Sequence, residues 1–216
     1  MPVHDWTRVA AGIFHDFRHC WVSALQSALN RQLLPDSFYA LVTREFHPVS
    51  GHRNQAATES DQYARKASQI AVRLVSGDTV AAVIELVSPG NKASAGEFRT
   101  FVEKAAGLIR GGIHLVIADV FPPGPRDPNG VHAAIWDEIA DGGFVLPADA
   151  PLTQVSYCAG VNEYEAFVEP VALGLPLPDL PLFLTPDFHL PLPLEATYQA
   201  AWAEVPARWQ RVLAPQ

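Results

Sequence analysis

One acidic residue is a candidate for chemistry because of its position in the sequence. Glu85 lies inside the apolar run Val-Ala-Ala-Val-Ile-Glu-Leu-Val at 80–87, which ends in the polar turn Ser-Pro-Gly-Asn-Lys at 88–92. Alternation along a strand puts apolar residues on both faces of this run, so we expect a central strand that is covered on both sides. An unpaired carboxylate is costly there. The sequence therefore predicts a cation or a metal ion as the partner of Glu85.

A lysine on the following predicted helix can complete a hydrolytic site. Lys104 falls at the margin of the apolar stripe of a helix over 94–109, from where its side chain can reach the end of the strand. In metal-dependent phosphodiesterases a carboxylate holds a divalent ion, and the ion and a lysine activate water and stabilise the phosphorane. Glu85 and Lys104 can fill these roles with Mg²⁺ or Mn²⁺. The alternative is a structural ion pair of Glu85 with Lys92, Arg73 or Lys104.

Two further motifs contain residue types that bind ligands. Lys92 closes the turn at 88–92, which can hold an anion although it lacks the spacing of a Walker loop. His15 and His19 share one face of a predicted helix, as in the zinc-protease motif. The acid between them is an aspartate, which is too short to serve as the general base, and we expect no zinc site there. His114 lies on an apolar strand, and we expect it to be a hydrogen-bonded core histidine.

The elements that must position these residues follow from the hydrophobic pattern. β-rich runs at 69–75 and 79–87 flank Ser-Gly-Asp and predict a hairpin. A serine and a glutamate three residues apart predict the start of a helix at 94, and two glycines end it at 111–112. An apolar strand follows at 113–121. Strand, helix and strand in this order predict a crossover between parallel strands, so the core is α/β.

The remaining elements surround this unit. We expect one domain over 1–216, with its core at about 38–121. Outside the hairpin and crossover the pattern predicts helices at 13–33 and 131–140, strands starting at 38–42 and pairing at 152–158 and 164–171, and a loop at 47–62. Prolines recur through about 175–194, which predicts an extended arm on the surface that can pair only as an edge. A C-terminal helix is predicted at about 195–213, kinked at Pro206.

Composition excludes several classes of protein. Of the 216 residues 49% are hydrophobic, and the two cysteines, Cys20 and Cys158, lie far apart, so we expect buried thiols rather than a disulfide framework. No apolar run reaches the length of a membrane helix and no leader pattern is seen, so we expect a soluble cytoplasmic protein. The net charge of −8 argues against nonspecific nucleic-acid binding, yet residues 44–110 hold nine basic and seven acidic residues. Nucleic acid is therefore a weak expectation, and a protein partner on the arm is open.

Five segments resemble a bacterial domain-of-unknown-function family, the one numbered 4058. They are Met-Pro-Val-His-Asp-Trp-Thr-Arg-Val at 1–9, Gly-Ile-Phe-His-Asp-Phe at 12–17, Val-Ile-Glu-Leu-Val-Ser-Pro-Gly-Asn-Lys at 83–92, Phe-Pro-Pro-Gly-Pro-Arg-Asp-Pro-Asn-Gly at 121–130 and Pro-Leu-Glu-Ala-Thr-Tyr-Gln-Ala-Ala-Trp at 193–202. Together they extend over nearly the whole chain. The middle segment is similar to the endonucleases of the PD-(D/E)xK superfamily in which the lysine has moved from the strand to the helix.

This resemblance implies a restriction-endonuclease-like core, a mixed sheet with a crossover helix. It makes Glu85 a metal ligand, Lys104 the catalytic lysine with Lys92 as a further catalytic candidate, and Asp119 a supporting acid at the metal. Relatives carry a Pro-Asp strand upstream of the hairpin, whose aspartate is the second ligand. The corresponding stretch, 48–63, contains only Asp61, without a preceding proline. Because this mechanism needs two carboxylates, the site is either degenerate or completed by Asp61.

Two functions therefore stand side by side. One is a Mg²⁺- or Mn²⁺-dependent phosphodiesterase of the nuclease type, and the other is a noncatalytic binding or scaffold protein that retains the fold. The enzyme requires a second carboxylate within about 5 Å of Glu85 and an open cleft. The scaffold requires a salt-bridged Glu85 that water does not reach.

Overall fold

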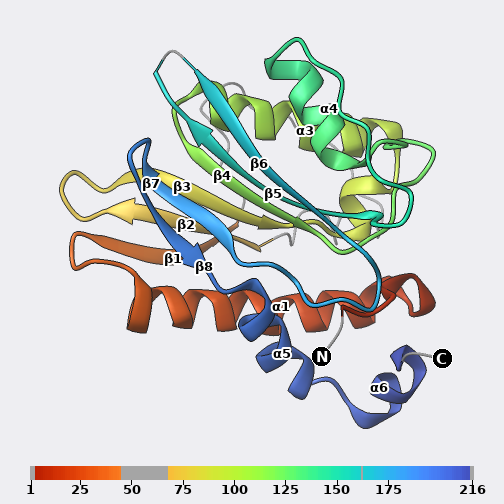
Figure 1. The fold of residues 1–216 in the computed structure, drawn as a ribbon. Coiled ribbons are helices and arrows are strands. Elements are labelled where there is room, and N and C mark those ends of the chain that lie inside the picture. The colour runs from red at the N-terminus through yellow and green to blue at the C-terminus, as the bar shows by residue number, and fades with distance from the viewer. Residues whose placement is uncertain (1–2, 45–67, 162, 215–216) are drawn as a thin grey trace, which may run out of the picture.

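The computed structural model describes residues 3–44, 68–161 and 163–214. Its centre is a six-stranded sheet with the strands in chain order, in which β3 and β4 are parallel and all other neighbours are antiparallel (Figure 1). The strands are β1 (Phe38–Arg44), β2 (Ser68–Leu74), β3 (Thr79–Leu86), β4 (His114–Asp119), β5 (Leu152–Ala159) and β6 (Tyr164–Val171). The predicted α/β class and the mixed sheet are confirmed. Residues 45–67, which include Asp61 and the whole of the predicted loop, lie outside the described residues.

The predicted β2–β3 hairpin is confirmed, and its turn residues explain its geometry. Gly77 and Asp78 have φ values of 84° and 52°, in the left-handed region that a tight hairpin turn requires. Asp78 is held by Arg73 on β2, whose Nε lies 2.7 Å from its Oδ1. The last five residues of β3, through Leu86, are all buried, as expected for a strand covered on both faces.

The crossover from β3 to β4 runs through a short 3₁₀ turn, η3 (Pro89–Lys92), and helix α3 (Ala95–Arg110). At the start of α3 the Ser94 hydroxyl accepts a hydrogen bond from the Glu97 backbone N–H at 3.1 Å. The helix ends at Gly111, and Gly112 has a φ of 75°. The predicted apolar stripe is buried throughout: Phe98, Phe101, Val102, Ala105, Leu108 and Ile109. Helix α3 is therefore held on the sheet by the face that its 3.6-residue period predicted.

The sheet separates two apolar cores. On one face α3 and α4 (Gly130–Ile139) cover a cluster that includes Val83 and Ile117 (Figure 1). On the other face α1 (Ala11–Ala28), which continues into the π-helical turn η2 (Leu29–Leu33), packs with α5 (Leu194–Ala203) over Ile84 and Val116. Successive side chains of β3 and β4 thus point into different cores. Glu85, two positions after Val83, therefore points toward the side covered by α3.

The proline-rich segment differs from the prediction. It is extended, but it forms its own hairpin of β7 (Leu180–Thr185) and β8 (Phe188–Leu192), and β7 contacts β3, β4 and β5 (Figure 1). Leu180, Leu182 and Leu192 are at most 1% exposed. The expectation of an arm on the surface was wrong because proline excludes a central position in a ladder but leaves the leucines between the prolines free to be buried.

The two ends of the described chain are joined through one hydroxyl group. The Tyr198 hydroxyl on α5 accepts hydrogen bonds from the His4 backbone N–H at 3.1 Å and from Trp6 Nε1 at 3.0 Å, and lies 2.9 Å from His4 Nδ1. The His4 ring stacks on Trp202 with 3.5 Å between the ring centroids. Trp6 itself belongs to the 3₁₀ turn η1 (Trp6–Arg8). The first and last of the five segments singled out in the sequence therefore form one packed structure.

The C-terminal helix is divided rather than merely kinked. Helix α5 ends at Ala203, and α6 (Ala207–Leu213) begins directly after Pro206. Proline removes a backbone donor and collides with the preceding turn, which accounts for the break. The segment after the break still returns to the core, since Leu213 is buried.

Candidate functional site

Glu85 finds its partner on the crossover helix. Lys104 Nζ donates to both carboxylate oxygens of Glu85, at 2.9 Å to Oε2 and 3.2 Å to Oε1. Glu85 is 3% exposed and the Lys104 side chain 11%, so the pair is largely shielded from water. Position explains the contact: Glu85 is near the carboxyl end of β3, and α3 returns over the same face of the sheet. The predicted approach of Lys104 to Glu85 is confirmed.

A second cation lies close to this pair. Arg18 on α1 is 1% exposed, and its Nε donates to the backbone oxygen of Leu86 at 2.8 Å. Burial lowers the pKa of Arg18 and the negative charge of Glu85 opposes that shift. Arg18 was not among the predicted site residues. The sequence did contain a signal, since Arg18 is the one charged residue in the stripe of Phe14, Phe17 and Trp21.

The strand beside Glu85 contributes an amide instead of an acid. In the antiparallel register Ile70 pairs with Ile84, which places Gln69 on β2 opposite Glu85 and on the same face. Gln69 is 1% exposed, and among the described residues neither its Oε1 nor its Nε2 has a hydrogen-bond partner. The neighbour of Glu85 on β2 is therefore a neutral side chain.

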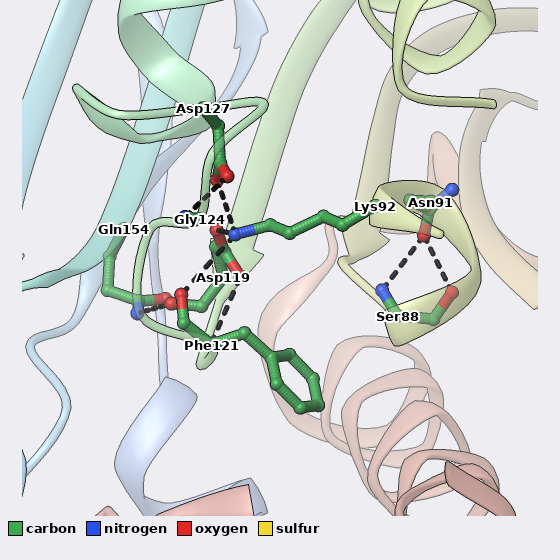
Figure 2. Close-up of polar contacts among 8 residues, drawn as sticks. All are labelled: Ser88, Asn91, Lys92, Asp119, Phe121, Gly124, Asp127 and Gln154. Carbon is green, nitrogen blue, oxygen red and sulfur yellow. Dashed lines mark hydrogen bonds and ion pairs between the residues drawn. The ribbon is translucent and has the colours of Figure 1, made fainter. Parts of the chain in front are cut away.

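A second buried cluster forms where β4 ends. Lys92 Nζ lies 2.6 Å from Asp119 Oδ2 and 2.6 Å from Asp127 Oδ2 (Figure 2). Both aspartates are nearly inaccessible, at 1% and 2% exposure. Burial alone would lower the pKa of Lys92, but the two carboxylates outweigh it and raise that pKa, so the lysine is charged. Lys92 and Asp119, both predicted as site residues, thus meet each other and not Glu85.

Local hydrogen bonds fix the loops that hold this cluster. Asn91 Oδ1 accepts from both the backbone N–H and the hydroxyl of Ser88, which closes the turn that carries Lys92 (Figure 2). Asp127 Oδ1 accepts from the Gly124 backbone N–H at 2.8 Å. Arg126 donates to the backbone oxygen of Lys92 at 3.0 Å. The cluster therefore ties the turn after β3 to the proline-rich loop after β4.

Asp127 was not among the predicted site residues. Residues 122–130 were predicted to be a turn region because they are rich in Pro, Gly, Asn and Asp, which are typical of turns. The available signal was that Asp127 belongs to one of the five segments of the resemblance. Only the folded chain shows that its carboxylate is 1% exposed and faces a lysine 35 positions upstream.

The described residues do not fit a Mg²⁺ or Mn²⁺ site. These ions bind to carboxylate oxygens, and both oxygens of Glu85 accept hydrogen bonds from an ammonium group. Asp119 is engaged by Lys92. Within residues 3–44, 68–161 and 163–214 no group of three or more His, Cys, Asp or Glu side chains is arranged to hold a metal ion. Asp61, the predicted second ligand, lies outside the described residues.

The histidines and cysteines occupy other parts of the molecule. His114 is 4% exposed, and its Nδ1 accepts from the Ala159 backbone N–H at 3.0 Å, which confirms the predicted core histidine. His15 and His19 lie on an exposed part of α1 with their Nε2 atoms 2.9 Å apart. Cys20 and Cys158 are both free; Cys158 is buried as predicted, but Cys20 is only partly buried.

Comparison of the chain with family models, with curated proteins and with solved structures yields no match in any of the three. Among the described residues, no helix has the length and apolar character needed to cross a membrane.

Proposed function

We propose that this protein is a noncatalytic binding or scaffold protein on a nuclease-like arrangement of strands and crossover helix. One observation carries the proposal: both carboxylate oxygens of Glu85 are hydrogen-bonded to Lys104 in a position that is 3% exposed. A carboxylate that serves as a metal ligand must direct a lone pair toward a divalent ion. Here the group occupying that direction is itself a cation, and it is the partner that compensates for the burial of Glu85.

The charges around Glu85 support the same function. The described residues near the carboxylate include two cations, Lys104 and Arg18, and the cross-strand neighbour is the neutral Gln69. The ammonium group of Lys104 opposes the approach of Mg²⁺ or Mn²⁺ to the carboxylate oxygens to which it donates. On β2, the position opposite Glu85 holds an amide where the nuclease-type mechanism needs a second carboxylate.

Two further predicted site residues, Lys92 and Asp119, have a structural role. Lys92 and Asp119 are joined to each other and to Asp127, so the candidate lysine and supporting acid hold the loop at 122–130 on the end of β4. A buried lysine between two carboxylates is fixed in place and is not available to a reacting phosphate. The cluster supports a rigid surface at this edge of the sheet.

The partner that we propose is a protein and not a nucleic acid. Between residues 68 and 110 four cations are engaged by acids: Arg73 by Asp78, Lys92 by Asp119 and Asp127, Arg99 by Glu103, and Lys104 by Glu85. A nucleic-acid footprint requires basic side chains that are free to contact phosphates. The small basic excess noted in the sequence is thus largely neutralised where the structure describes it.

The phosphodiesterase remains the second candidate, and a specific observation favours it. Glu85 and Lys104 meet at the carboxyl end of a strand, from the elements that the resemblance implies. In that function Glu85 and Asp61 would hold the divalent ion, and Lys104 would stabilise the charge on the phosphate. The two candidates therefore differ in whether Glu85 and Asp61 bind a divalent ion together.

Calorimetric titration with Mn²⁺ separates the two functions. The variants are Glu85→Gln and Asp61→Ala, and Glu103→Gln serves as the matched control because Glu103 lies one position before Lys104 and is exposed. All proteins carry His15→Ala, which removes an imidazole that divalent metals can bind. Each sample is also incubated with Mn²⁺ and with single- and double-stranded DNA and RNA.

For the binding or scaffold protein we expect no micromolar Mn²⁺ binding that depends on Glu85, and no cleavage of any substrate. Micromolar binding that both Glu85→Gln and Asp61→Ala abolish, while Glu103→Gln leaves it intact, would overturn the proposal. Cleavage lost in the same two variants would establish the phosphodiesterase.

A further inference from the structure

Two histidines outside the candidate site form a distinct constellation on α1. His15 and His19 are one helical turn apart, and their Nε2 atoms lie 2.9 Å from each other with the rings nearly perpendicular at 89°. We propose that this pair is a surface site for a first-row divalent transition ion of the Cu²⁺ and Ni²⁺ class, bound through the two Nε2 atoms. The inference is independent of the proposed function.

The distance between the nitrogens is that of a hydrogen bond in the ion-free pair, and two cis ligands of one ion need a similar separation. A metal bound to two imidazoles at about 2.0–2.1 Å places the nitrogens roughly 2.9 Å apart when they are cis at 90°, and roughly 3.4 Å apart in a tetrahedral site. The separation of His15 and His19 matches the cis arrangement. Square-planar and octahedral coordination are the preferences of Cu²⁺ and Ni²⁺, and imidazole suits both ions.

The backbone makes the site preorganised. Both residues lie well inside α1, which runs from Ala11 to Ala28, and residues four apart lie on the same face of a helix. The aromatic residues Phe14 and Phe17, on other faces of the same helix, are 1% exposed and fix its orientation on the core. The two imidazoles are therefore held toward solvent by a helix that does not need to rearrange when an ion binds.

Acidic groups nearby add attraction for a cation. His19 lines a hollow of about 440 Å³ between α1 and α5, together with Cys20 and Glu204. Burial raises the pKa of the Cys20 thiol, and the negative charges of Asp16 and Glu204 raise it further, so both carboxylates act at this place.

Binding requires a change of tautomer and no change of charge on the protein. In the ion-free pair one Nε2–H donates to the lone pair of the other Nε2. To bind the ion, that ring must carry its proton on Nδ1, so that both Nε2 lone pairs point to the metal. Within the described chain no group of three or more His, Cys, Asp or Glu side chains is arranged to hold a metal ion, so the two imidazoles are the ligands that we assign to the site.

The test is Cu²⁺ and Ni²⁺ titration of the intact protein by calorimetry, with the Cu²⁺ complex also examined by electron paramagnetic resonance. The variants are His15→Ala and His19→Ala. His189→Ala removes an exposed histidine elsewhere, and Cys20→Ser removes the neighbouring thiol; both are controls. Thermal unfolding verifies that each variant is folded.

We expect one binding equivalent that either histidine substitution weakens roughly 10–100-fold, because the second imidazole acts at a high effective concentration. Cu²⁺ should bind more tightly than Ni²⁺, and its spectrum should show coupling to two nitrogens that falls to one in each variant. Unchanged binding in both histidine variants would refute the site. Loss of the equivalent in Cys20→Ser, with the histidine variants unaffected, would show that the thiol is the ligand and would also refute it.

Discussion

Lys104 on α3 and Glu85 on β3 are joined by two hydrogen bonds, so that one ammonium group spans both oxygens of one carboxylate. The bonds connect the crossover helix to the strand that precedes it. Both groups lie in a largely dry environment, where an ion pair is strong but each unpaired member is costly. Removing one member of the pair should therefore lower stability strongly, because it leaves the other charge buried without its partner.

A double-mutant cycle tests the pair. Lys104→Met should lower the free energy of unfolding by about 3 kcal/mol, because it leaves a buried carboxylate without its main partner. Adding Glu85→Gln should recover part of that loss, since the remaining groups are uncharged. Urea unfolding at pH 7 measures the stability of wild type, the two single variants and the double variant. As a control, Glu103→Gln should change stability by less than about 0.5 kcal/mol. Strictly additive losses would show that the two side chains are not coupled.

Removal of Lys92 should produce a pH-dependent loss. Lys92→Met leaves Asp119 and Asp127 buried together without a cation, which should cost about 3–5 kcal/mol at pH 7.5. Without the lysine, burial and mutual repulsion raise the carboxyl pKa in the folded state above its unfolded value. The folded variant then binds more protons than the unfolded chain, so its deficit relative to wild type should shrink from pH 7.5 to pH 5. A deficit that stays constant or grows over this interval would contradict the assignment.

His4 should make the protein sensitive to acid. Burial, with a contribution from the N-terminal charge, lowers the pKa of His4 to about 4. Because the folded pKa lies below the unfolded value, the unfolded chain takes up the proton first, and stability is lost as the pH falls from about 6.5 toward 4. Between pH 7 and pH 5 wild type should lose about 1–2 kcal/mol more than His4→Asn. Chemical denaturation at the two pH values measures the difference. His189→Asn should behave as wild type, and an unchanged pH profile in His4→Asn would rule out the effect.

The proline-rich hairpin should behave as part of the core. Leu182 on β7 is fully buried, so Leu182→Ala should cost about 2–5 kcal/mol through lost burial and the cavity that remains. Leu175, which is 54% exposed in the same segment, provides the control, and Leu175→Ala should change stability by less than about 0.5 kcal/mol. Thermal or urea unfolding measures the stability of both variants. Similar small effects for both would restore the surface arm that the sequence predicted.

Local patterns were sufficient for the elements around the candidate site. The turn at Gly77 and Asp78, the Ser94 cap and the glycine end at Gly111 each act within a few residues, so the hairpin and the crossover helix were predicted from short stretches. The proline-rich segment was mispredicted for the same reason. Proline governs local hydrogen bonding, but whether the intervening leucines are buried depends on the sheet that they meet.

The candidate site was predicted only in part. The apolar run around Glu85 required a charged partner, and Lys104 was one of three cations that the helix and turn could bring to it. Asp127 and Arg18 were not predicted, because their importance depends on contacts across 35 and 68 positions of sequence. Gln69 became significant only when the register placed it opposite Glu85.

The sequence by itself determined that the chain has an α/β core, that Glu85 is in a central strand, and that this carboxylate cannot stay unpaired. Those conclusions follow from side-chain period and from the cost of burying a charge, both of which act locally. The tertiary structure alone decided which cation each acid receives: Lys104 for Glu85, and Lys92 for Asp119 and Asp127. The pairing depends on the strand register and on the return path of α3, because the strength of an ion pair is set by distance and burial and not by separation along the chain.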